Sequence, residues 1–105
     1  MQIKSIDAFR KEFKKLSKRY ASLPDDLRYL VQSLADNPSQ GTPIGRSCYK
    51  IRLRISSKNT GKSGGARVIT HVYIEGETVT LLSIYDKSEQ ENILDAEILK
   101  RLNEL

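Results

Sequence analysis

The amino-acid sequence predicts a small α+β protein, in which an N-terminal helical hairpin packs on a mostly antiparallel, twisted sheet of about four strands. Apolar residues recur at steps of three and four in the first third of the chain, which is typical of amphipathic helices. In residues 48–55 and 66–75 they alternate with other residues along the chain, which is typical of strands with one buried face. A length of 105 residues indicates a single domain over residues 1–105, ending in a short helix.

The helical hairpin follows a weakly indicated first strand at residues 1–5. Its first helix has an apolar stripe formed by Ile6, Phe9, Phe13, Leu16 and Tyr20. The opposite face is basic (Arg10, Lys11, Lys14, Lys15, Lys18 and Arg19) and is interpreted either as a solvated surface or as a nucleic-acid contact.

The second helix should begin at Ser22, which can act as its N-cap, and Pro24 suits the first turn. It should end by Asn37, because the following Pro38 disfavours helix in the residue before it. Gly and Pro residues then predict a loop over residues 38–45.

Three strands are predicted after this loop, at about residues 49–56, 66–75 and 78–85, with a tight turn at 75–77. Their short connections favour an antiparallel meander. The sequence Ser88-Glu89-Gln90-Glu91 is a capping-box pattern, so the last helix is expected to start there. Its apolar edge would be formed by Leu94, Ile98, Leu102 and Leu105.

The charge of the chain is unevenly distributed. The formal net charge is +5, yet residues 46–74 contain seven Lys or Arg and no Asp or Glu, whereas residues 75–105 contain eight acidic residues. The basic segment is a candidate nucleic-acid footprint, and a generally basic surface is the alternative.

Cationic side chains alternate with apolar ones along the first long strand. Lys50, Arg52 and Arg54 share one face, where they could meet Arg67 of the next strand. Four cations at this density would bind a phosphodiester and stabilise a doubly charged transition state. At the end of the third strand, Tyr85 could stack on a base or assist proton transfer, or it could be an ordinary core-edge tyrosine, and Lys87 could reach the same face.

The glycine-rich segment 59–65 does not fit a phosphate-binding P-loop, because Ser56 occupies the place of the first glycine and a strand follows instead of a helix. Its backbone N–H groups and Lys62 could still contact an anion. A flexible hairpin connection explains the same composition equally well.

The remaining reactive residues predict neither a metal site nor a cofactor. His71 is the single histidine and has no set of partners with ligand spacing, so it is interpreted as a sheet-surface residue. Cys48, the single cysteine, is interpreted as a small residue at a strand start in a reducing compartment, with a catalytic thiol served by His71 as the less favoured reading. The absence of a long apolar run and of a signal-like N-terminus predicts a cytoplasmic protein.

The order of helices and strands, together with the segments 49–54, 61–69 and 81–89, resembles the RelE/HigB-like toxins of bacterial type II toxin–antitoxin modules, in the RelE/ParE superfamily. The resemblance implies a ribosome-dependent endoribonuclease that cleaves mRNA in the ribosomal A site. It also implies neutralisation by a tightly bound antitoxin.

The family's basic site residues match Lys50, Arg52, Arg67 and, less closely, Arg54. Ser88 stands where the RelE branch has an arginine, and Leu94 lies near the place of that branch's C-terminal tyrosine. Tyr85 belongs to the Ile-Tyr-Asp-Lys pattern of the HigB-like branch.

The site expected from these residues has a catalytic part and an RNA-binding part. The catalytic residues would be Lys50, Arg52, Arg67 and Tyr85, and Arg54, Lys62 and Lys87 would contact RNA or 16S ribosomal RNA. RNA would be cleaved through its own 2′-OH, without a metal or other cofactor.

Two other functions stay open at this point: a non-catalytic gyrase inhibitor of the ParE type and a plain nucleic-acid-binding module. An antitoxin is expected to cover the cationic face with an acidic or amphipathic segment or to displace the C-terminal helix within residues 88–104. Alternatively, the acidic segment 75–105 could bind a basic part of that partner. No membrane or small-molecule partner is expected.

Overall fold

The computed structural model describes residues 1–57 and 65–105 and confirms the α+β class. In chain order the elements of the described residues are β1 (Gln2–Ser5), α1 (Asp7–Arg19), α2 (Leu23–Asp36), β2 (Thr42–Gly45), β3 (Cys48–Leu53), β4 (Ala66–Tyr73), β5 (Thr78–Asp86) and α3 (Asp95–Leu102).

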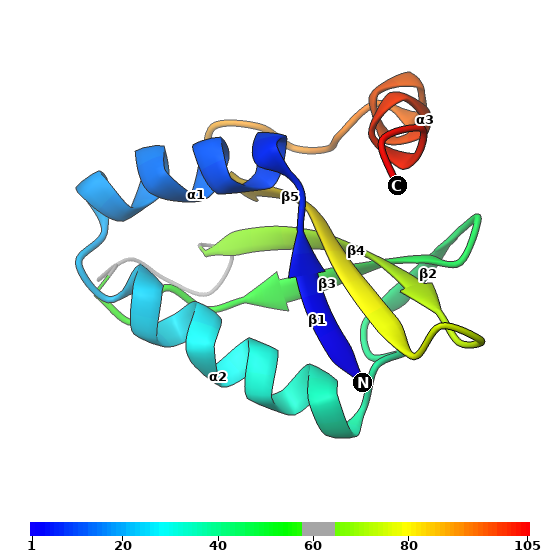
Figure 1. The fold of residues 1–105 in the computed structure, drawn as a ribbon. Coiled ribbons are helices and arrows are strands. Elements are labelled where there is room, and N and C mark those ends of the chain that lie inside the picture. Colours follow the sequence, from blue (N-terminus) through cyan, green and yellow to red (C-terminus); the bar gives the residue numbers. More distant parts are fainter. Residues whose placement is uncertain (58–64) are drawn as a thin grey trace.

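The described strands form one twisted sheet in the order β1-β5-β4-β3-β2 (Figure 1). β3, β4 and β5 form the predicted antiparallel meander, and β1 adds to β5 in parallel. β2 lies in the segment predicted as a loop, and that part of the prediction is wrong. It pairs with β3 through a tight turn in which Arg46 and Ser47 both have positive φ (54° and 59°), the geometry of a two-residue hairpin loop.

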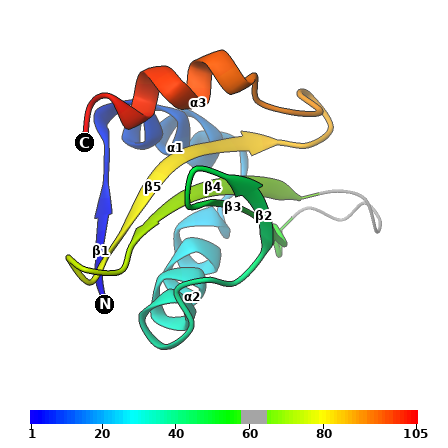
Figure 2. The same cartoon turned by 90° about the vertical axis from the view of Figure 1, so that its right-hand side faces the viewer.

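The helices lie on different sides of this sheet. α2 and α3 cover opposite faces, and α1 runs beside β5 (Figure 2). Buried apolar side chains of both N-terminal helices join those of the sheet in one core, which confirms that the helical hairpin packs on the sheet. The helical members of this core are Phe9, Leu16, Leu23, Leu30, Leu34 and Ile98.

α1 also covers part of an open sheet edge. β1 pairs with β5 only as far as Leu81, so the following backbone of β5 has no strand on that side. Glu12 of α1 reaches this edge, where its Oε1 accepts hydrogen bonds from the Ile84 N–H (3.2 Å) and the Ser83 hydroxyl (3.0 Å). A carboxylate thus satisfies edge donors that would otherwise be left unpaired on burial.

The start of α2 differs from a simple N-cap. The helix begins at Leu23 with Pro24 in its first turn, as predicted, but Ser22 makes no side-chain capping bond. Its hydroxyl instead donates to Asp26 Oδ2 (2.8 Å), and Asp26 also accepts from the backbone N–H (2.9 Å) and hydroxyl (2.6 Å) of Ser56. This buried carboxylate therefore fastens α2 to the segment that follows β3.

α3 begins at Asp95, so the prediction of a helix starting at Ser88 is wrong. The N–H and hydroxyl of Ser88 both donate to Asp86 Oδ1 (2.9 and 2.8 Å), and a side chain engaged in this way does not cap a helix. Of the predicted apolar edge, Ile98 is buried and Leu102 half-buried, whereas Leu94 and Leu105 are exposed. In the described residues, no helix is long and apolar enough to cross a membrane.

Candidate active site

Three of the predicted site residues form a row across the middle of the sheet. Arg52 of β3 is the register partner of Arg67 on β4, and Arg67 is in turn the partner of Tyr85 on β5. Directly paired residues project from the same face, with their Cβ atoms about 5 Å apart. Antiparallel pairing thus brings together side chains that lie far apart in the sequence.

The members of this row differ in exposure. Arg52 is exposed, as its place on the cationic side of the alternating strand predicts. Arg67 and Tyr85 are buried, with only 8% and 4% of their surfaces accessible. The row therefore runs from a solvent-facing guanidinium to a buried guanidinium and a buried phenol.

The positive charge of Arg52 and Arg67 is not balanced by nearby carboxylates of the described residues. Arg67 donates to the Ala66 carbonyl (3.1 Å), and within the described residues neither Arg52 nor Arg67 forms an ion pair with a carboxylate. Like charges directly opposite each other in a sheet are destabilising. An anion bound between them would relieve this repulsion, and the planar fork of arginine matches phosphate oxygens.

The Tyr85 hydroxyl is buried and has no hydrogen-bond partner in the described part of the chain. Burial raises the pKa of the Tyr85 phenol above its ordinary value, against the opposing effect of the positive charge of Arg67. The phenol therefore keeps its proton at neutral pH and can donate a hydrogen bond to an anion beside Arg67.

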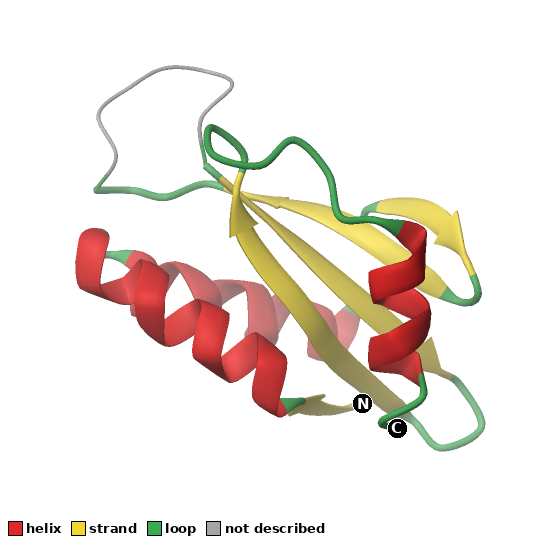
Figure 3. Cartoon of the chain, turned by 90° about the horizontal axis from the view of Figure 1, so that it is seen from above, coloured by secondary structure: helices red, strands yellow, loops and turns green. Residues whose placement is uncertain are grey.

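Lys50 lies on the same face as this row and is half-buried. Its Nζ donates to Oδ1 of Asn92 at 2.9 Å. Asn92 belongs to the segment between β5 and α3, which passes over the sheet before α3 begins (Figure 3). Sequence reasoning missed Asn92, because no local pattern relates it to a strand more than 40 residues away.

The three residues predicted to contact RNA are placed differently. Arg54 follows the end of β3 and is exposed. Its positive charge helps to lower the pKa of Asp26, where hydrogen bonds from Ser56 and Ser22 outweigh the opposing effect of burial. Lys87 follows β5 and is half-buried, with its backbone N–H bonded to the Gly65 carbonyl (3.0 Å), and Lys62 lies outside the described residues.

Cys48 and His71 are also register partners, on the same sheet face as Lys50 and Arg67. Cys48 is fully buried, and its Sγ donates to the Arg46 carbonyl (3.6 Å). Burial raises the pKa of this thiol and lowers that of His71, which is half-buried and not fully on the surface as predicted. Both shifts favour the neutral forms, which weakens the interpretation as a thiolate–imidazolium pair.

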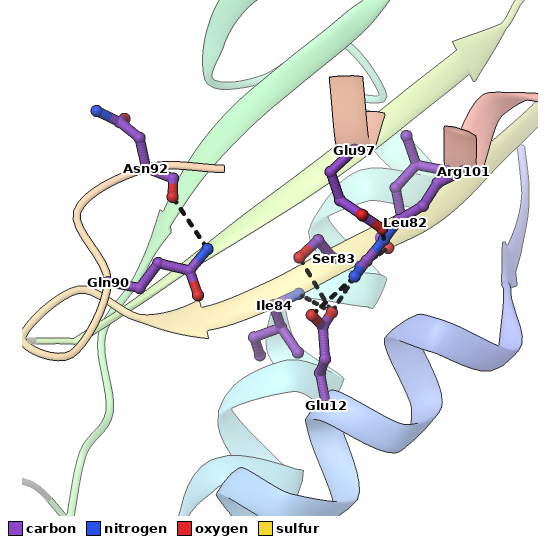
Figure 4. Close-up of polar contacts among 8 residues, drawn as sticks. All are labelled: Glu12, Leu82, Ser83, Ile84, Gln90, Asn92, Glu97 and Arg101. Atoms are coloured by element: carbon purple, nitrogen blue, oxygen red, sulfur yellow. Dashed lines mark hydrogen bonds and ion pairs between the residues drawn. The ribbon is translucent and has the colours of Figure 1, made fainter. Parts of the chain in front are cut away.

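A polar cluster holds α3 against the sheet and α1 (Figure 4). Arg101 of α3 donates to both carboxylate oxygens of Glu12 (2.8 and 3.0 Å), to the Leu82 carbonyl (2.8 Å) and to Glu97 (2.8 Å). Hydrogen bonding to Glu12 is the largest of the effects that raise the pKa of Arg101, and burial opposes it. Glu12 thus accepts hydrogen bonds both from the edge of β5 and from Arg101 of α3.

No family model matches the sequence. The structure is similar to solved bacterial toxins: a variant of E. coli toxin RelE in the free state is 22% identical, with a TM-score of 0.69 over 96% of both chains. The toxin in the E. coli RelBE toxin–antitoxin complex is 22% identical, with a TM-score of 0.58 over 79% of this chain and 92% of that one. A metal-bound toxin from Helicobacter pylori is 20% identical, with a TM-score of 0.53 over 86% of this chain and 98% of that one. The chain therefore has a RelE-like toxin fold, and the resemblance found in the sequence is confirmed at this level.

Proposed function

We propose that this protein, with its RelE-like fold, is the toxin of a type II toxin–antitoxin module and a ribosome-dependent endoribonuclease that cleaves mRNA in the ribosomal A site. The main support is the row formed by Arg52, Arg67 and Tyr85, in which two arginines without carboxylate partners in the described residues lie beside a protonated phenol. Such a row is suited to binding a phosphodiester and the extra negative charge that develops on it during cleavage.

The two arginines have separate roles in this proposal. Arg52 is exposed and first captures the scissile phosphate. Arg67 is buried, so its charge acts where water screens it less, and it stabilises the pentacoordinate transition state. Lys50 adds charge from the same face once its ammonium leaves Asn92.

Tyr85 acts as a hydrogen-bond donor in this site. Because its ring is buried, little of its face is available for stacking on a base. Because burial raises the pKa of its phenol, it is poorly suited to accept a proton at neutral pH. Its O–H instead donates to a phosphate oxygen or to the departing oxygen.

The cleavage step itself uses the RNA's own 2′-OH. The 2′ oxygen attacks phosphorus while the bond from phosphorus to the 5′ oxygen breaks, which gives a 2′,3′-cyclic phosphate and a free 5′-OH. The proton of the 2′-OH passes to solvent, and the 5′ oxygen takes a proton from water while it accepts a hydrogen bond from Tyr85. These steps use the RNA's 2′-OH, solvent and side chains of the protein, and they require no metal or cofactor.

Arg54, Lys62 and Lys87 would guide RNA and 16S ribosomal RNA toward the row. Arg54 is exposed at the end of β3, and Lys87 follows β5 directly after the Tyr85-Asp86 end of the strand. Charges at such positions raise the rate of encounter with a polyanion more than the rate of chemistry.

The cognate antitoxin would act through the same face. α3 and the segment before it cover part of the face on which the row lies, and α3 is fastened through Arg101 and Glu12 (Figure 4). An acidic or amphipathic antitoxin segment could displace α3 and bind Arg52 and Arg67 of the row.

The proposal is tested by primer extension on a defined mRNA in a reconstituted translation reaction. The wild-type protein should cut at A-site codons only when ribosomes are present, and Arg67→Ala and Arg52→Ala should abolish the cuts. Arg28→Ala is the matched control, because Arg28 is an exposed arginine of α2 that pairs with Asp25. Intact mRNA would refute the nuclease. If the same protein preparation then inhibited DNA supercoiling by gyrase, an inhibitor of the ParE type would be supported.

A further inference from the structure

A buried carboxylate lies directly next to the site residues in sequence but on the other face of the sheet. Asp86 ends β5, is 2% exposed and pairs with Ala66, whereas the preceding Tyr85 pairs with Arg67. The Tyr20 hydroxyl at the end of α1 donates to Asp86 Oδ2 at 2.6 Å. The other carboxylate oxygen accepts from Ser88, so one side chain joins α1 to the end of β5.

The main chain around Asp86 is fixed as well. Its carbonyl accepts hydrogen bonds from the N–H groups of Glu89 and Gln90, both at 3.0 Å. The N–H of Lys87 donates to the Gly65 carbonyl at 3.0 Å, next to the end of the β4–β5 pairing. The direction in which the chain leaves β5, and with it the place of Lys87, therefore depends on this turn.

α1 contacts the same turn a second time. Arg19 forms an ion pair with Glu89, and its guanidinium carbon lies 5.3 Å from the centre of the Tyr20 ring. Tyr20 is thus held from one side by Arg19 while its hydroxyl binds Asp86.

We propose that Asp86 is a positioning residue: together with Tyr20 it fixes the end of β5 so that Tyr85 projects toward the phosphate bound by the arginine row and Lys87 toward the incoming RNA. This inference rests on the proposed nuclease function. Successive residues of a strand point to opposite faces, so the Asp86 carboxylate does not touch RNA. It acts by anchoring the backbone between Tyr85 and Lys87. Catalytic geometry is sensitive to such anchoring, because a displacement of about 1 Å can lower the rate by about 100-fold.

The test uses Tyr20→Phe, which removes the hydroxyl that binds Asp86 and keeps the ring that packs under Arg19. Tyr29→Phe is the matched control, because Tyr29 is 74% exposed on α2. Cleavage on programmed ribosomes should show a kcat lowered about 10-fold in Tyr20→Phe with KM unchanged within about twofold, since substrate capture depends on Arg52. The control should match the wild type.

A second readout does not depend on activity. In protein carrying ¹³C-labelled tyrosine, the Tyr85 signal, assigned with Tyr85→Phe, reports the titration of its phenol. Tyr20→Phe should shift this titration to lower pH, because a loosened β5 end admits water to the phenol. If Tyr20→Phe leaves both kcat and the Tyr85 titration as in the wild type, the positioning role is refuted. If the wild-type protein does not cleave at all, the nuclease proposal fails. In that case the titration still tests the anchoring, because an unchanged Tyr85 titration in Tyr20→Phe would overturn it.

Discussion

Arg67 and Tyr85 are register partners on β4 and β5, and both side chains are buried. The Tyr85 hydroxyl nevertheless has no hydrogen-bond partner in the described residues. A buried unpaired hydroxyl costs stability of the order of 1–3 kcal/mol. A ligand that completes its hydrogen bonding would recover this energy, which supports the proposal that a phosphate oxygen binds beside this pair.

Tyr85→Phe is therefore expected to separate stability from activity. Removing an unpaired hydroxyl should leave the free energy of unfolding unchanged or raise it by about 1 kcal/mol. The same change should slow cleavage at least about 10-fold, because the donor to the phosphate is lost. Urea unfolding and single-turnover cleavage measure the two effects, and a variant that is less stable but fully active would contradict the assigned role.

Arg101→Met should release α3 from the sheet. The change leaves the Glu12 carboxylate without its bidentate partner and should cost about 2–3 kcal/mol of stability. Amide hydrogen exchange of residues 95–102 should accelerate, whereas that of β4 should change little. Lys100→Met, at an exposed neighbouring position of α3, is the control; equal exchange in the two variants would show that the ion pair does not hold the helix.

Asp26→Asn should destabilise the protein in a pH-dependent way. The pKa of Asp26 in the folded state lies below its ordinary value of 3.8, because hydrogen bonds from Ser56 and Ser22 outweigh the effect of burial. The charged form is thus favoured by folding, so its contribution is present above pH 3.8 and is lost as the pH falls through the folded-state pKa.

Urea titrations should show the variant less stable than the wild type by about 2 kcal/mol at pH 7, with the gap narrowing below pH 3.8. Asp25→Asn changes an exposed neighbouring carboxylate and should have little effect at pH 7. A gap that is constant from pH 7 to pH 3 would contradict the assignment.

Arg54→Gln should affect RNA binding, whereas Arg52→Gln should affect the rate of cleavage. Arg54 lies beyond β3, so its loss should reduce the salt dependence of ribosome or RNA binding by about one phosphate contact and leave the single-turnover rate nearly unchanged. Arg52→Gln should lower that rate itself by about 100-fold or more. Equal rate losses in the two variants would place Arg54 in the row as well.

The strand pattern of the sequence predicted the centre of the sheet because alternation of apolar and cationic residues depends on local geometry alone. It predicted the faces of Arg52 and Ile51 correctly, and the basic residue at the start of the next strand led to Arg67. It did not predict that Arg67 and Tyr85 are buried, because burial depends on which segments pack over a face.

The missed features depend on contacts between distant segments. Ser88 has the local sequence of a helix cap, yet Asp86 captures its side chain, and α3 starts seven residues later. β2 has a Gly- and Pro-rich sequence and becomes a strand through its pairing with β3. The contact of Lys50 with Asn92 has no local signal of any kind.

The most direct test of the central claim is single-turnover cleavage on ribosomes that hold one defined A-site codon, with ribose or 2′-deoxyribose at the scissile nucleotide. Wild-type protein should convert the ribose substrate to a 2′,3′-cyclic phosphate and leave the deoxy substrate intact, and Arg52→Ala combined with Arg67→Ala should lose the reaction while still folding. Cleavage of the deoxy substrate, or an active double variant, would contradict the proposal that this row stabilises attack by the 2′-OH.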